Sequence, residues 1–268
     1  MKNIAVILAG GVGSRLWPLS TEAHPKYLLS INEEEIILSR HLNELSKLGF
    51  YKIVLITSHH AYESVEQVIR QAGIDNLDIF IEPLQKNTAP SLIYAAEIIK
   101  NSILEDCNLM VFPSDAYISA YSFIKDLIEK FKDSSNDFPI ISAVKVDKKP
   151  SSQFGYILGK KLHNNLYKTS QFIEKPNESE IKKFKGCKAY LNTGIFITKL
   201  NYFLEELERL NPVLCNQVRG SIVKDNNSLL YKKFAEIKPL SIDKALFEKT
   251  KKHFFFNLEQ DWTDIGSF

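Results

Sequence analysis

Short apolar runs alternate with amphipathic stretches through the first half of the chain. The runs predict strands buried on both faces of a parallel sheet, because apolar side chains fall on both faces. They cover residues 4–8, 52–57, 77–82, 109–112 and 139–146. Between them, apolar residues recur at helical spacing over 62–69, 92–99 and 123–131. This alternation predicts βαβ units, and hence an α/β fold with a mostly parallel central sheet and helices on both faces.

The second half of the chain has a different pattern. It predicts strands at residues 155–159, 166–174, 189–198 and 254–258, and helices at 177–184, 202–210, 229–237 and 242–249. No internal repeat, low-complexity tract or linker separates the halves. We therefore expect a single domain over residues 1–268, in which the second half packs on the same sheet and forms the second wall of a cleft.

Composition and charge limit the kinds of partner that the chain is expected to bind. The 268 residues are 44% hydrophobic, and 34 Lys and Arg balance 32 Asp and Glu to a net charge of +2. A chain this close to neutral gives no electrostatic reason to expect nucleic acid or a membrane surface as a partner. Any anion must therefore be bound by a local cluster of cations.

The cysteines and the start of the chain predict a cytoplasmic protein. Cys107, Cys187 and Cys215 are odd in number and form no CxxC pair, which argues against a disulfide framework or a structural zinc site. The opening apolar run stops at Gly10, too early for a signal peptide, and no later run reaches the length of a membrane span.

A glycine-rich turn, Gly10-Gly11-Val12-Gly13-Ser14-Arg15, follows the first predicted strand. Glycines there let the backbone turn sharply and present N–H groups to an anion. The turn lacks the GK[ST] of a P-loop, and Leu16 stands where the dinucleotide fingerprint requires its third glycine. Arg15 and Lys26 would suit a polyphosphate. Taken alone, however, a tight turn with two solvated cations is the more frequent outcome.

Further motifs favour the phosphate site. In chain order they are GGVGSRLWPLS, HPKYLL, EPLQKNTAP, FPSD, FIEKP, NTG, SIDKA and DWTDIG. Together they resemble the signature of the sugar-nucleotide pyrophosphorylase family, and most closely that of its mannose-1-phosphate guanylyltransferase (GDP-mannose pyrophosphorylase) branch. The ordered series is far more specific than any one motif.

The resemblance implies a Rossmann-like nucleotidyltransferase fold with a nucleotide-binding half over 1–150 and a sugar-phosphate-binding half over 151–268. It implies transfer of GMP from GTP to mannose 1-phosphate, giving GDP-mannose and pyrophosphate by in-line attack at the α-phosphate. The attacking group is already an oxyanion, so positioning and charge stabilisation are the tasks of the protein.

The resemblance also implies roles for individual residues. The catalytic residues are Arg15, Lys26, Asp115 and Asp264, and the last two hold a Mg²⁺ ion that bridges the phosphates. The nucleotide-binding residues are Leu8, Ala9, Gly10, Gly11, Gly13, Ser14, Asn87 and Thr88. The sugar-phosphate-binding residues are Gly155, Glu174, Lys175 and Asn192, with Lys175 orienting the incoming phosphate.

Several of these residues also have a plain structural alternative. Asp115 could cap a helix or form a turn, and Asp264 could lie in a surface turn with Asp261 as the metal ligand instead. Lys175 and Glu174 could form an ordinary surface pair. The segment 87–90 could simply start a helix, a role compatible with lining the nucleotide site.

Departures from the family pattern concern specificity and assembly. Tyr27, Lys86 and Ala116 replace the family's Gln, Arg and His, and Ser152-Gln153 replaces a Thr-Gly pair. The alternatives are a nucleotidyltransferase that uses another sugar 1-phosphate, such as a manno-heptose 1-phosphate, or another nucleotide, and a non-catalytic nucleotide-sugar sensor. The sequence ends just after DWTDIG, without the family's C-terminal β-rich extension, and the assembly we consider is a homodimer.

Overall fold

The computed structural model of the chain describes residues 1–11, 13, 16–32, 35–103, 105–134, 137–147, 149–163, 165–184, 188–222 and 227–265. Ser14, Arg15 and Cys187, which the sequence analysis names, lie outside these residues. Among the helices described, none combines the length and apolar character needed to cross a bilayer.

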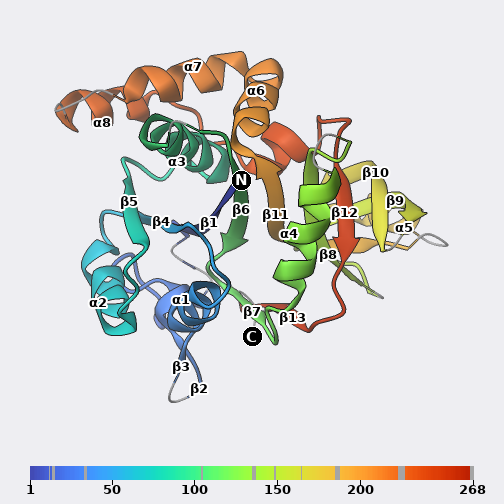
Figure 1. Cartoon of the computed structure of the whole chain (residues 1–268), viewed down its shortest axis with the longest axis horizontal. Helices are drawn as coiled ribbons and strands as arrows, with labels where there is room; N and C mark the ends of the chain where they lie inside the picture. Colours follow the sequence, from blue (N-terminus) through green and yellow to red (C-terminus); the bar gives the residue numbers. More distant parts are fainter. Residues whose placement is uncertain are drawn as a thin grey trace.

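One sheet runs through both halves of the chain (Figure 1). Within the described residues it has nine strands in the order β5-β4-β1-β6-β11-β8-β12-β10-β9. Their bounds are β1 (Lys2–Ala9), β4 (Lys52–Ser58), β5 (Leu77–Glu82), β6 (Cys107–Pro113), β8 (Ile140–Val146), β9 (Gly155–His163), β10 (Leu166–Glu174), β11 (Tyr190–Lys199) and β12 (Phe254–Asn257). Each lies within a few residues of a strand that the sequence predicts.

The expectation of a mostly parallel sheet is not confirmed, because the sheet is mixed. Strands β5, β4, β1 and β6 are parallel, as predicted for the first half. Strand β11 then runs antiparallel to both β6 and β8, and β10 runs antiparallel to both β12 and β9. Apolar runs report burial rather than direction, and β8 and β11 are buried almost throughout like parallel strands.

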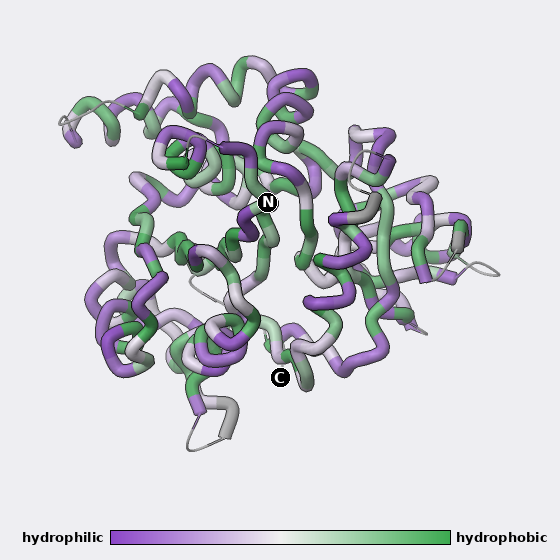
Figure 2. The backbone as a smooth tube through the Cα atoms, in the orientation of Figure 1, coloured by the Kyte–Doolittle hydropathy of each residue, from purple (hydrophilic) through white to green (hydrophobic). Residues whose placement is uncertain are grey.

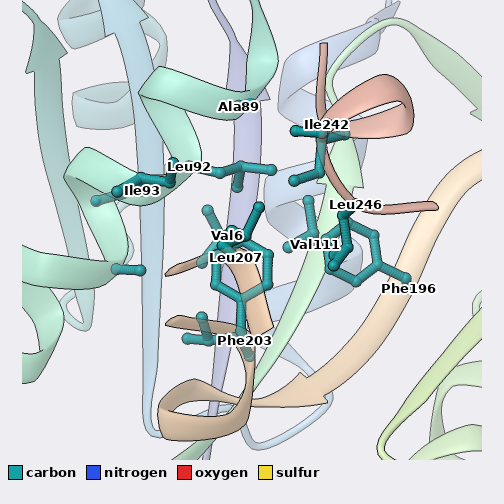
Figure 3. Close-up of a cluster of buried hydrophobic side chains, with 14 of the residues drawn as sticks. Val6, Ala89, Leu92, Ile93, Val111, Phe196, Phe203, Leu207, Ile242 and Leu246 are labelled. Carbon is teal, nitrogen blue, oxygen red and sulfur yellow. The ribbon is translucent and has the colours of Figure 1, made fainter. Parts of the chain in front are cut away.

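Helices cover both faces of the sheet, as predicted. One face packs on α3 (Thr88–Ser102), α6 (Leu200–Leu210) and α7 (Pro212–Ser221), as Figure 3 shows for part of this cluster. The other face packs on α1 (Ile37–Ser46), α2 (Tyr62–Ala72) and α4 (Phe123–Ser134). Apolar segments accordingly gather along the strands and polar ones on the outer helices (Figure 2). Each large apolar side chain buried in these clusters contributes about 1.5–3 kcal/mol.

Further elements complete the fold. They are the short helix η2 (Lys26–Leu28), β2 (Ser30–Asn32), β3 (Glu35–Ile36), β7 (Ala116–Ile118), α5 (Glu178–Lys183), α8 (Asn227–Ala235), the π-helical turn η3 (Asp243–Phe247) and β13 (Trp262–Asp264). The sequence predicts α5, α8 and the helical turn at η3. Helices α1 and α7 and the two-strand ribbon β7–β13 are not among its predictions.

Helix α1 is joined to strand β7 by a hydrogen bond from a buried histidine. His41 Nε2 lies 2.8 Å from the Ala116 carbonyl oxygen, so it must donate, and Nδ1 accepts from the Tyr121 hydroxyl at 2.6 Å. Burial lowers the pKa of His41 to about 4, which keeps the imidazole neutral in this role.

We therefore expect Tyr121→Phe to lower the free energy of unfolding by about 1–3 kcal/mol, because it leaves the buried Nδ1 without a donor. Urea denaturation measures the effect. The control is Tyr51→Phe at a side chain that is 50% exposed, for which we expect a change within about 0.5 kcal/mol. Equal effects of the two substitutions would contradict the assignment.

Candidate active site

Two distant carboxylates meet at the carboxyl end of β6. Asp115 follows β6, and β13 pairs antiparallel with β7 so that Asp264 lies opposite Ala116. The backbone N–H of Ile265 donates to the Asp115 carbonyl at 3.1 Å, which fixes this register. The predicted pair is thus brought together.

Asp115 lies in the turn between β6 and β7, as its turn alternative describes, whereas its helix-cap alternative and the surface-turn alternative for Asp264 are not borne out. The residues after Asp115 form strand β7 rather than a helix, so Asp115 caps no helix start. Asp264 belongs to a strand and its side chain is 22% exposed. Asp261 is 88% exposed and pairs with Lys145 at 3.8 Å, away from the pair.

Lys26 lies between the two carboxylates. Its side chain is 10% exposed, and its Nζ contacts the Asp115 carboxylate and lies 3.4 Å from Asp264 Oδ1. The stem of Lys26 crosses Gly13, where a Cβ would come within 2.7–2.9 Å of three Lys26 carbons and where φ is +74°. Glycine is therefore required at position 13 to seat this lysine.

The donor set of this cluster fits magnesium. Mg²⁺ commonly takes one or two carboxylates and completes its shell with water and substrate phosphates. In the described part of the chain, no three His, Cys, Asp or Glu side chains gather into a site that would enclose a metal by itself. Two oxygen donors and a neighbouring lysine leave a net negative charge, which suits a divalent cation shared with phosphates.

A cavity of about 500 Å³ opens beside the glycine turn. Its described lining consists of Leu8, Gly10, Gly11, Ile56, Glu82, Gln85, Asn87, Thr88, Ser91, Pro113, Ser114, Asp115 and Pro239. Five predicted nucleotide-binding residues are in this set. Ala9 is not: its side chain is buried and its carbonyl accepts from the Tyr27 hydroxyl at 2.6 Å. Gly13 supports Lys26 instead.

The start of α3 forms one wall of this cavity. The Asn87 side chain accepts from the Thr88 N–H at 2.8 Å, and the Thr88 hydroxyl accepts from the Ile242 N–H at 2.8 Å. Asn87 has a φ of 69°, which turns the chain into the helix. The helix-start alternative and the cavity-lining prediction are therefore compatible.

Glu82, at the end of β5, is a cavity residue that the sequence analysis does not single out. It is 3% exposed, and its Oε2 accepts from the Ser91 hydroxyl at 2.5 Å. A Cβ at Gly10 would lie 2.5 Å from its Oε1, so the carboxylate sits directly against the glycine turn. Burial raises the pKa of Glu82 to about 7. The sequence does offer a clue to this residue, because Glu82 is a charged residue at the end of an apolar strand and begins the EPLQKNTAP motif.

A second cavity of about 210 Å³ adjoins the first and shares Leu8, Thr88, Pro113 and Asp115 with it. Its lining includes Asp264 and the predicted sugar-side residues Gly155, Glu174 and Asn192. The pair of aspartates therefore lies where the two cavities meet. A Cβ at Gly155 would lie 2.6 Å from Glu174 Oε2, so glycine leaves room for that carboxylate.

Lys175 lies at the edge of this arrangement. Its side chain is 62% exposed, and its Nζ is 3.6 Å from Glu174 Oε1. It is not among the described lining residues of either cavity, although its φ of 51° marks a sharp turn directly after the β10 strand end. In this structure an exposed Lys175 pairs with Glu174, whose own side chain is only 15% exposed and lines the second cavity.

Asp243 is a half-buried carboxyl in the lining of the second cavity, and no role is predicted for it from the sequence. Its Oδ1 accepts from Asn192 Nδ2 at 3.0 Å, and Asn192 Oδ1 in turn accepts from the Gly194 N–H at 3.2 Å. Burial, and then the charge of Glu174, raises the pKa of Asp243 to about 7. Asp243 therefore orients the amide of Asn192 in the second cavity.

This shift predicts how Asp243 affects stability. The pKa of Asp243 in the folded protein is raised above the ordinary 3.8. The stabilisation that protonated Asp243 contributes is therefore complete below pH 3.8 and is lost as the pH rises through 7. Asp243→Asn keeps an oxygen that can accept from Asn192. Its free energy of unfolding should exceed that of the parent by roughly 1–3 kcal/mol at pH 8 and equal it near pH 4. Denaturant titrations at both pH values measure this. The exposed Asp75→Asn should show no such trend; a parent more stable than Asp243→Asn at pH 8 would contradict the prediction.

Comparisons with known proteins show the family to which the chain belongs. A sequence profile described as nucleotidyl transferase matches residues 4–268. Mannose-1-phosphate guanylyltransferase 2 of Escherichia coli O157:H7 is 34% identical over 280 residues, which cover 99% of this chain and 58% of that protein. The chain thus spans less than two thirds of that relative.

Two solved structures have a similar fold. One, described as a mannose-1-phosphate geranyltransferase from Thermus thermophilus, has a TM-score of 0.84 at 25% identity and covers 99% of this chain and 77% of its own. The other, described as a mannose-6-phosphate isomerase from Helicobacter pylori, has a TM-score of 0.82 at 23% identity and covers 98% and 100%. The second likeness is one of fold alone.

Proposed function

The chain belongs to the nucleotidyl transferase family, and on that premise we propose that it transfers GMP from GTP to mannose 1-phosphate. The products are GDP-mannose and pyrophosphate. The observation that carries the proposal is the cluster of Asp115, Asp264 and Lys26 at the junction of two cavities. The printed name of the Escherichia coli relative supports the choice of substrates.

The reaction needs positioning rather than a protein nucleophile. A phosphate oxygen of mannose 1-phosphate attacks the α-phosphorus of GTP. The bond from that phosphorus to the α,β-bridging oxygen breaks, and pyrophosphate leaves with the electron pair. Charge accumulates on the phosphate oxygens, so nearby cations and N–H groups lower the barrier.

The residues divide the work between the cavities. The larger cavity takes the nucleoside, and the glycine turn with Arg15 and Ser14 takes the triphosphate. Lys26 lies beside the transferred group, and Asp115 and Asp264 would hold Mg²⁺. That ion, when bound, supplies positive charge to the phosphate oxygens of both substrates.

The smaller cavity takes the sugar phosphate. Glu174 and Asn192 line it and would bond sugar hydroxyls, with Gly155 leaving room beside them. Lys175 pairs with Glu174 of this cavity at 3.6 Å, and in the proposed reaction it would turn from that carboxylate toward the incoming phosphate. On this proposal, residues 1–150 supply most of the nucleotide side and residues 151–268 most of the sugar-phosphate side, with Leu8, Thr88, Pro113 and Asp115 shared by both cavities.

Pyrophosphate release tests the proposal. The full chain is incubated with Mg²⁺, one of four nucleoside triphosphates, and mannose, glucose or manno-heptose 1-phosphate. Highest turnover with GTP and mannose 1-phosphate supports the proposal, whereas a higher rate for another pair reassigns the substrates. Tight GDP-mannose binding in calorimetry without turnover of any pair would instead indicate a nucleotide-sugar sensor.

A further inference from the structure

A short segment, residues 259–261, connects the main sheet to the ribbon that carries Asp264. The chain leaves the sheet after β12 at Leu258, which is buried and whose N–H donates to the Val144 carbonyl at 2.7 Å. Beyond the segment, β13 lies beside β7 (Figure 1). Asp264 is the last residue of β13, three positions after the segment ends. The position of the segment therefore determines where this carboxylate lies.

Lys145, on β8, holds this segment against the sheet. Its Nζ donates to the Gln260 carbonyl at 2.7 Å and to the Glu259 carbonyl at 3.1 Å. The Asp261 carboxylate lies 3.8 Å from the same Nζ. The side chain of Lys145 is 29% exposed, so the ammonium has exchanged part of its water for these oxygens. Hydrogen bonds from a charged donor are stronger than neutral ones, and two consecutive carbonyls of the segment receive them.

The ribbon fixes its own register only weakly. Strands β7 and β13 pair over three residues, and a two-strand ribbon of this size is marginally stable in water by itself. Because side chains alternate between faces, a slip of one residue would turn Asp264 away from the other carboxylate. Strand β7 has an anchor of its own, since Arg40 Nη2 donates to the Ile118 and Ser119 carbonyls at 3.3 and 3.2 Å. Lys145 is the matching anchor for β13.

We propose that Lys145 is a positioning residue for the metal site, which fixes the register of β13 so that Asp264 and Asp115 face the same Mg²⁺. The inference rests on the proposed function, in which these two carboxylates share the ion. Lys145 is not among the described lining residues of either cavity, so it acts through the backbone of residues 259 and 260. If only a fraction of the molecules holds Asp264 in place, the apparent dissociation constant for the metal rises by the inverse of that fraction.

Amide hydrogen exchange of the full chain tests the anchor without any ligand. Lys145→Met keeps a long side chain and removes the ammonium. It should speed exchange by about tenfold or more at the N–H groups of Asp261 and Ile265, which are hydrogen-bonded to the two residues that flank β7. Exchange in β12 should stay as in the parent, because that strand keeps its pairing with β8 and β10.

Calorimetric titration with Mg²⁺ alone tests the coupling to the metal site. Lys145→Met should raise the dissociation constant for Mg²⁺ by about 10–100-fold, the usual loss when a residue that orients a metal ligand is removed. In pyrophosphate release, the same variant should need more Mg²⁺ for half of its maximal rate. Its kcat at saturating Mg²⁺ should return to within about threefold of the parent, because the metal binds the molecules in which Asp264 is in place.

Three further variants keep the test decisive. Lys145→Arg retains a cation with several donors and should keep the dissociation constant for Mg²⁺ within about threefold of the parent, even if Lys145→Met folds poorly. Lys233→Met is the matched control, since Lys233 Nζ also donates to a carbonyl, that of Gly220 at 2.8 Å, on α8 and outside the described lining of both cavities. Asp261→Asn removes only the exposed carboxylate. Both controls should leave Mg²⁺ binding unchanged.

The outcomes separate the two proposals. Unchanged exchange at Asp261 and Ile265 in Lys145→Met, or an unchanged dissociation constant for Mg²⁺, overturns the inference and leaves the proposed function standing. Faster exchange throughout the chain, with an equal loss of Mg²⁺ binding in Lys145→Arg, would assign Lys145 to general stability and also overturn it. A parent that binds no Mg²⁺ overturns it as well. If the parent binds Mg²⁺ but turns over no substrate pair, the proposed function fails, while exchange and calorimetry still decide the inference.

Discussion

Asp264→Asn is expected to reduce kcat by at least about 10³-fold while shifting the melting temperature by no more than a few degrees. The large loss follows because the substitution removes one of the two carboxylates that would share Mg²⁺ with both substrates. The small shift follows because Lys26 keeps its contact with Asp115, and the Asp264 side chain is already 22% exposed. Strand β13 keeps its backbone pairing with β7 in the variant.

Pyrophosphate release over a range of Mg²⁺ concentrations and thermal unfolding of the same samples measure the two effects. The matched control is Asp261→Asn, three residues earlier, whose side chain is 88% exposed. It should leave kcat within about twofold of the parent, as expected for a surface substitution. A fall in melting temperature of more than about 10 °C with Asp264→Asn would instead assign that residue to the architecture.

The strands are predicted well because their signal is local. The segments 52–57 and 166–174, for instance, differ little from β4 (Lys52–Ser58) and β10 (Leu166–Glu174). Strand direction is not local, since it depends on which neighbour each strand meets. The apolar run that becomes β11 therefore gives no warning that it enters the sheet antiparallel to β6.

The ribbon β7–β13 shows which parts of the site the ordered motifs predict and which they do not. Its strands are three residues each and too short for periodicity to detect. The resemblance nevertheless predicts the two aspartates together, and the pairing of Asp264 with Ala116 supplies the physical reason. Glu82 and Asp243 stay hidden because their interest lies in burial, which depends on segments far away in the chain.

Lys26→Met is expected to lower kcat by about 10²–10³-fold and, at the same time, to strengthen Mg²⁺ binding by the free protein. The first effect follows from the loss of a cation beside the transferred phosphate. The second follows because Lys26 Nζ lies against both carboxylates and competes with a metal for them. Without it, two like charges face each other, and a bound cation relieves their repulsion.

Stability provides a readout of this competition that does not depend on turnover. Without Mg²⁺, Lys26→Met should be less stable than the parent by roughly 1–3 kcal/mol, because the largely buried ion pairs are broken. Added Mg²⁺ should then raise its melting temperature more than that of the parent, since a ligand stabilises the form it binds more tightly. The control is Lys52→Met, which breaks a 2.7 Å pair with Asp78 outside both cavities and should gain nothing extra from Mg²⁺. If Mg²⁺ stabilises the parent and Lys26→Met equally, the lysine does not occupy the position of the metal, and the two carboxylates must bind the ion without displacing it.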